Sequence, residues 1–128
     1  MRMTALDRWY DYMKSHDHKA LWDLLHPDAV FESPVVHTTQ RGRDITHKYL
    51  SSALKVLGGP GFAYVGEWRS RDGAVLEFEA EIDGIAINGV DIIRFADDGR
   101  ILHFKVMVRP LKAINLLHRM MGEELSKR

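Results

Sequence analysis

The clearest pattern in this chain is an alternation of apolar and polar positions in its second half. Residues 74–82 have the cleanest alternation in the chain, with Leu76, Phe78, Ala80 and Ile82 on one face and Glu77, Glu79 and Glu81 on the other. A period of two is typical of a strand with one buried face. The same pattern predicts a strand over 62–70 and two more within 85–109, joined by a turn at 97–99 whose glycine tolerates positive φ.

The first half and the C-terminus have a helical pattern instead. Apolar residues recur every three or four positions and predict helices over 4–15, 19–26, 43–57 and 111–124. Pro27 is expected to end the second helix, and a glycine-rich run at 58–61 ends the third. A short strand at 29–33 and an irregular or edge segment at 35–41 lie between these two helices.

The order of these elements predicts the fold class. Helices followed by consecutive antiparallel strands make an α+β domain, here one domain spanning 1–128. Because long strands twist, we expect a cone-shaped, curved antiparallel sheet with three N-terminal helices over its concave face and a C-terminal helix. The open end of such a cone is a natural site for a small apolar ligand.

One carboxylate interrupts this apolar pattern. Asp91 lies among Val90, Ile92 and Ile93, and alternation places it on the same face as Ile93 and Phe95. It is either a strand carboxylate paired with an arginine or with water, or a pocket acid whose pKa burial raises.

Composition narrows the classes of partner. The 128 residues hold 18 Lys and Arg against 18 Asp and Glu, a balance that argues against nucleic acid and against an anionic membrane surface. There is no cysteine, so disulfides and thiolate chemistry are excluded. No apolar run approaches the ~18 residues of a membrane span, and a cytoplasmic location is the default expectation. The histidines show no ligand spacing, so we expect no metal, and the absence of a glycine-rich phosphate loop predicts no nucleotide cofactor.

Two segments carry a resemblance to a known family. The stretches HPDAVFESP and NGVDIIRFADDGRI, in this order of elements, resemble the nuclear transport factor 2-like (cystatin-like) superfamily, in particular its SnoaL-like and ketosteroid isomerase-like branches. The resemblance spans essentially the whole chain. It implies the cone fold strongly and function weakly, because this fold hosts isomerases, cyclases, dehydratases, epoxide hydrolases and binding domains.

The resemblance also implies roles for single residues. Asp91 matches the strand carboxyl that donates a hydrogen bond in the isomerases or acts as general acid/base in the cyclases. Ser33, before Pro34, stands where the isomerases have their aspartate base, so steroid isomerase activity is not implied. Trp9 stands near their oxyanion-donating tyrosine, and an indole cannot take over its proton chemistry.

The remaining candidates surround Asp91. His37 is either a solvated loop histidine or a second proton carrier beside Asp91. The residues expected to shape the pocket and bind the ligand are Trp9, Ser33, Tyr49, Phe78, Ile93, Phe104 and Val106. The opposite sheet face carries Val90, Ile92 and Met107 and predicts a two-fold homodimer.

Three functions remain open on these residues. The first is cofactor-free acid/base chemistry of isomerase, cyclase or dehydratase type on a small apolar, cyclic, oxygenated molecule. The second is a non-catalytic ligand-binding or dimeric interaction domain, which the serine at position 33 favours. The third is epoxide hydrolysis by an activated water, which lacks a pocket arginine.

Overall fold

The computed structural model describes residues 4–127. Its four helices are α1 (Ala5–Ser15), α2 (His18–Leu24), α3 (Arg43–Leu57) and α4 (Leu111–Leu125). The N-terminus of α1 follows from its sequence, because the Thr4 side chain accepts a hydrogen bond from the Asp7 amide and the Asp7 carboxylate accepts one from the Thr4 amide. The predicted bounds of α3 are confirmed at both ends.

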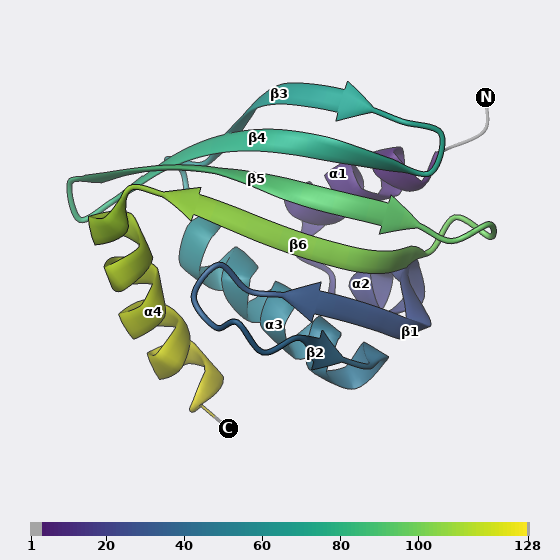
Figure 1. The fold of residues 1–128 in the computed structure, drawn as a ribbon, viewed down its shortest axis with the longest axis horizontal. Coiled ribbons are helices and arrows are strands. Elements are labelled where there is room, and N and C mark those ends of the chain that lie inside the picture. The colour runs from purple at the N-terminus through teal and green to yellow at the C-terminus, as the bar shows by residue number, and fades with distance from the viewer. Residues whose placement is uncertain (1–3, 128) are drawn as a thin grey trace.

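Six strands form a single sheet. They are β1 (Leu25–Glu32), β2 (Gln40–Arg41), β3 (Ala63–Arg69), β4 (Gly73–Ile82), β5 (Ile85–Phe95) and β6 (Ile101–Arg109), in the spatial order β2-β1-β6-β5-β4-β3. Every neighbouring pair is antiparallel except β1 and β6, which run parallel. The predicted antiparallel β3–β6 meander is confirmed, and the parallel β1 makes the sheet mixed (Figure 1).

The prediction for the chain around Pro27 was wrong. Helix α2 ends at Leu24 instead of continuing to residue 26, and β1 begins at Leu25 and passes through Pro27. Proline cannot donate to a strand ladder. The pairing of β1 with β6 shifts its register between Leu25 and Val30, so Pro27 lies in the interrupted part of the ladder.

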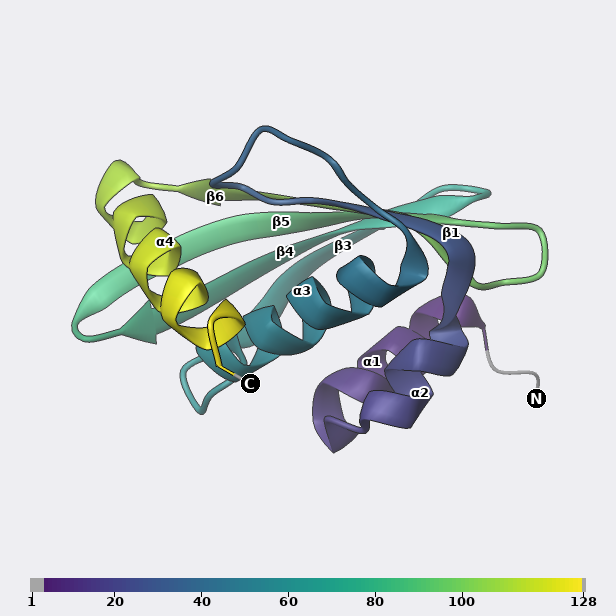
Figure 2. The same cartoon turned by 90° about the horizontal axis from the view of Figure 1, so that it is seen from below.

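The helices cover one face of the sheet. Figure 2 shows α1, α2 and α3 beneath the curved sheet and α4 across one end of it. The register places Leu76, Asp91 and Val106 in one row on the inner face, and each of the three is buried. Asp91 therefore faces inward, between the helices and the sheet.

A bulge in β3 changes which side chains face the helices. The register of β3 against β4 shifts between Tyr64, opposite Phe78, and Gly66, opposite Glu77. An extra residue in one strand reverses the alternation after it. Tyr64 and Glu67 therefore both face α1, although strict alternation would put them on opposite sides of the sheet.

Candidate functional site

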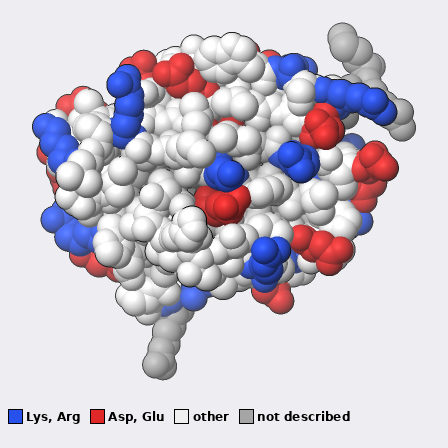
Figure 3. Space-filling model, viewed as in Figure 1, with Lys and Arg blue, Asp and Glu red and all other residues white. Residues whose placement is uncertain are grey.

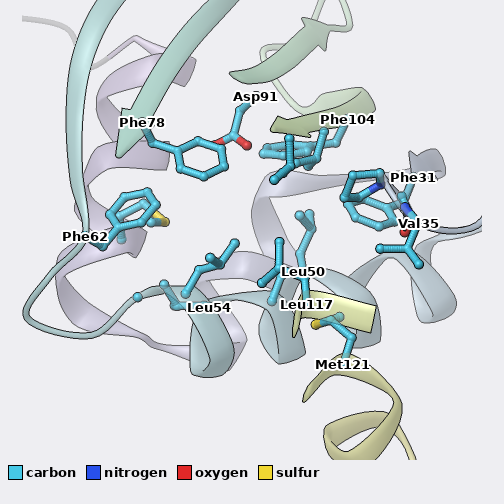
Figure 4. Close-up of a pocket in the computed structure, with 18 of the residues that line it drawn as sticks. Phe31, Val35, Leu50, Leu54, Phe62, Phe78, Asp91, Phe104, Leu117 and Met121 are labelled. Atoms are coloured by element: carbon cyan, nitrogen blue, oxygen red, sulfur yellow. Dashed lines mark hydrogen bonds between the residues drawn. The ribbon is translucent and has the colours of Figure 1, made fainter. Parts of the chain in front are cut away.

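An apolar cavity lies between the inner sheet face, α1, α3 and α4. Its volume is about 70 Å³, several times the roughly 10–15 Å³ that one water needs. In Figure 4 Phe62 and Phe78 lie on one side, Phe31 and Val35 on the other, Leu50 and Leu54 on α3, and Leu117 and Met121 on α4. Helix α4 therefore closes part of the cavity.

The polar wall of this cavity is a chain of three side chains. The indole Nε1 of Trp9 donates to the Tyr64 hydroxyl at 3.0 Å, and the Tyr64 hydroxyl donates to Oδ2 of Asp91 at 2.6 Å. The three residues come from α1, β3 and β5, and all of them line the cavity. The hydrogen bonds hold the Asp91 carboxyl in a single orientation, with Oδ2 engaged.

The second oxygen of this carboxyl faces the cavity. Asp91 is 6% exposed, and among residues 4–127 no hydrogen bond reaches its Oδ1. No buried side-chain nitrogen or oxygen of these residues is left without a partner. Oδ1 must therefore be accessible, and the space it can reach is the cavity that Asp91 lines.

Burial determines the protonation of Asp91. Loss of hydration raises the pKa of its carboxyl from 3.8 to about 7, and the hydrogen bond from Tyr64 lowers it by less. No Lys or Arg is among the described residues that line the cavity, so no cation stabilises the charged form. Near neutral pH the group is present in both forms and can give or take a proton.

Tyr64 is the site residue that the sequence analysis missed. Its hydroxyl is shielded from water and lies beside the Asp91 carboxyl, and both effects raise the pKa of the phenol. It therefore remains a neutral donor to Asp91. The sequence does show Tyr64 as a hydroxyl-bearing residue two positions after Phe62. The alternation does not show the bulge that follows it.

Six of the predicted site residues come together in the cavity. Asp91, Trp9, Ser33, Phe78, Phe104 and Val106 all line it. Ser33 follows the last residue of β1, and its Oγ accepts hydrogen bonds from the amides of Val35 and Val36 at 3.0 and 3.4 Å. The wall opposite α1 is thus formed by the β1 end and the loop after it.

Three predicted residues lie elsewhere. Tyr49 is half-buried and packs on Phe31 outside the cavity lining, because α3 turns the stripe containing Leu50 and Leu54 inward. Ile93 is buried in the core on the Asp91 face but does not reach the cavity. His37 is exposed on the β1–β2 loop and does not line the cavity.

Other kinds of site were also sought in the described part of the chain. Within residues 4–127 no group of three or more His, Asp or Glu side chains is placed to hold a metal ion. None of the described helices is long and apolar enough to cross a membrane.

With a curved, helix-covered sheet and a single acid in its apolar cavity, the chain has the architecture of the nuclear transport factor 2-like, ketosteroid isomerase-like proteins. A family model described as SnoaL-like domain matches residues 6–104. The chain therefore belongs to the SnoaL-like family, as its sequence motifs indicated.

Solved structures agree with this assignment. A crystal structure of a steroid delta-isomerase from Pseudomonas aeruginosa is 39% identical with a TM-score of 0.89, over 95% of this chain and 89% of that one. An uncharacterised cystatin-like protein from Silicibacter pomeroyi is 26% identical with a TM-score of 0.85, over 93% and 83% of the two chains. An NTF2-like protein of unknown function from Mesorhizobium loti is 25% identical with a TM-score of 0.70, over 83% and 88%. No curated protein matched this chain.

Proposed function

We propose that this protein binds a small apolar, cyclic molecule bearing an oxygen, and rearranges it by cofactor-free proton transfer at Asp91. The observation that carries the proposal is the Asp91 carboxyl, held by Tyr64 at one oxygen and open to an apolar cavity at the other. The cavity disfavours anionic ligands, because no Lys or Arg is among its described lining residues and burying an unpaired charge is costly. We therefore assign it a ligand that is neutral at its inner end.

A single carboxyl is enough for an isomerisation. The ionised Asp91 takes a proton from carbon next to a carbonyl, the double bond moves toward that carbonyl, and the neutral acid returns the proton to the distant carbon. No cofactor is consumed and the carboxyl is regenerated. A pKa of about 7 suits this cycle, because the carboxylate is then basic enough to take the proton and the neutral acid is acidic enough to return it.

One solved relative supports an isomerase-type reaction. The Pseudomonas aeruginosa protein is described as a steroid delta-isomerase. The family resemblance, however, puts Ser33 where those isomerases have a carboxylate base, and a serine hydroxyl cannot act as that base at neutral pH. We therefore assign proton transfer to Asp91 and do not transfer the steroid substrate.

The test is turnover of an unconjugated cyclic enone. Cyclohex-3-en-1-one isomerises to its conjugated form with a large rise in ultraviolet absorbance, and deuterium uptake from heavy water reports proton transfer. We expect catalysis by the wild type that is lost in Asp91→Asn and retained in Asp11→Asn, which alters an exposed carboxylate of α1. Equal rates for wild type and Asp91→Asn would refute the assignment.

One observation favours a second function, ligand binding without turnover. Apart from Asp91, the described cavity residues that carry an O–H or N–H are Trp9, Ser33 and Tyr64, and none of these readily exchanges a proton near neutral pH. A binding protein would take up 2-naphthol with similar affinity in wild type and Asp91→Asn and would show no deuterium exchange. Hydrolysis by activated water is less favoured, because no arginine is among the described cavity residues.

We also propose that the outer sheet face pairs two copies of the chain. Figure 3 shows this face as mostly uncharged surface with a small group of charged side chains near its centre. The outward residues of β4 include Glu77, Glu79 and Glu81, whereas those of β6 include Lys105 and Arg109. A two-fold axis along the intervening β5 would bring the acidic strand of one copy over the basic strand of the other.

A further inference from the structure

Among residues 4–127, two side chains that line the cavity keep a hydrogen-bonding group for a ligand. Trp9 Nε1 is used by Tyr64, and the Tyr64 O–H is used by Asp91. The other described lining residues offer hydrocarbon, thioether sulfur or backbone, apart from the Asp91 carboxyl and the Ser33 hydroxyl. These two groups must therefore select whatever polar atoms a ligand carries.

The hydroxyl of Ser33 can act only as a donor. Its Oγ already accepts from the amides of Val35 at 3.0 Å and Val36 at 3.4 Å, and these two bonds use the lone pairs of the oxygen. Within residues 4–127 the Ser33 hydroxyl donates to no acceptor. The turn thus fixes the oxygen, and its hydrogen is available to a ligand in the cavity that Ser33 lines.

The sheet register gives the separation of the two groups. Glu32 pairs with Lys105, so the next residue, Ser33, comes level with Val106, which in turn pairs with Asp91. Strand β6 lies between β1 and β5. With about 4.8 Å between neighbouring strands, the backbones at Ser33 and Asp91 are about 10 Å apart across the sheet, which is the upper limit for two side chains that face the same concave cavity. Val106 lines the cavity between them.

We infer that Ser33 is a specificity residue that donates a hydrogen bond to a second oxygen of the ligand, at the opposite end from the oxygen bound by Asp91. This inference rests on the proposed ligand binding at Asp91. With a hydrogen bond of about 2.8 Å at each end, it defines the ligand as a rigid apolar body about one ring long, lying across Val106. The oxygen at Ser33 must be an acceptor such as a carbonyl or ether, because a ligand N–H would find no free lone pair there.

A pair of isosteric probes tests this inference. In 4-acetylphenol the hydroxyl can reach Asp91 and the carbonyl can reach Ser33, whereas 4-isopropenylphenol has the same shape without the carbonyl acceptor. Dissociation constants are measured by calorimetry for wild type, Ser33→Ala and the control Ser51→Ala. Ser51 lies on α3 outside the cavity lining and bonds only to its own helix.

The expected result is a selective loss. Ser33→Ala should weaken the acetyl probe about 3- to 10-fold, the effect of one neutral hydrogen bond, and leave the isopropenyl probe unchanged. The infrared carbonyl stretch of the bound acetyl probe should lie at lower wavenumber in wild type and in Ser51→Ala than in Ser33→Ala.

Each other outcome has a definite meaning. If Ser33→Ala weakens both probes equally, the serine only shapes its loop and the inference is wrong. If both probes bind all three proteins equally, the inference is wrong while ligand binding in the cavity stands. If neither probe binds the wild type, the inference falls together with the proposed ligand binding.

Discussion

The sharpest test of the buried acid is the pH dependence of stability in Asp91→Asn. Burial raises the pKa of Asp91 from 3.8 to about 7 in the folded protein, a difference of roughly three units at 1.36 kcal/mol each. The folded state therefore binds this proton more tightly than the unfolded chain does. The stability linked to it is fully present below about pH 4 and lost as pH rises to about 7.

The loss in wild type relative to the variant amounts to about 4 kcal/mol between these limits, as an order of magnitude. Asparagine keeps the shape, can still accept the hydrogen bond from Tyr64, and does not titrate. We expect Asp91→Asn to match the wild type at pH 4 and to exceed its stability at pH 8.

Urea unfolding of both proteins at several pH values measures this difference directly. Taking the difference between variant and wild type removes the titration of all other groups, and Asp11→Asn controls for removal of an exposed carboxylate. A difference that stays constant with pH would contradict the buried-acid assignment. So would a wild type that gains stability over the variant as pH rises, because that requires a folded pKa below 3.8.

Three further predictions follow from the same geometry. Tyr64→Phe removes the hydrogen bond to Asp91 and leaves the Trp9 indole without its acceptor. The free energy of unfolding should therefore fall by about 1–3 kcal/mol, and the pKa of Asp91 should rise further. An unchanged carboxyl titration by NMR would contradict this. Leu117→Ala should lower the free energy of unfolding in urea by about 2–5 kcal/mol, because this α4 side chain is 3% exposed. The fluorescence of a hydrophobic dye should rise as the cavity opens. Unchanged stability would show that α4 is not part of the core. Light scattering should give twice the monomer mass for wild type and one monomer mass for Met107→Glu, whose side chain is exposed on the outer face; a wild-type monomer would refute the pairing.

Local pattern was enough to predict most of the framework. Alternation along β4, β5 and β6 put Asp91 on the inner face, because side chains of a strand change sides at every residue. Residues 43–57 were predicted as a helix with the bounds observed, because glycines stand at both ends. The acid in the cavity could thus be found without a structure.

The surroundings of that acid depended on non-local contacts. The β3 bulge that brings Tyr64 to Asp91 is a property of the pairing with β4, and the parallel course of β1 follows from the path of the chain across β6. Helix α3 has two adjacent apolar stripes, one containing Tyr49 and the other containing Leu50. Only packing against the sheet decided that the stripe with Leu50 turns inward.

The loop after β1 also shows what local pattern predicts and what only tertiary packing decides. From the sequence, His37 was either a solvated loop histidine or a second proton carrier beside Asp91. The structure turns the loop so that Ser33 lines the cavity and His37 is exposed. Periodicity predicts which face of an element is buried, but a loop has no period, so only tertiary packing decides which of its side chains meets the site.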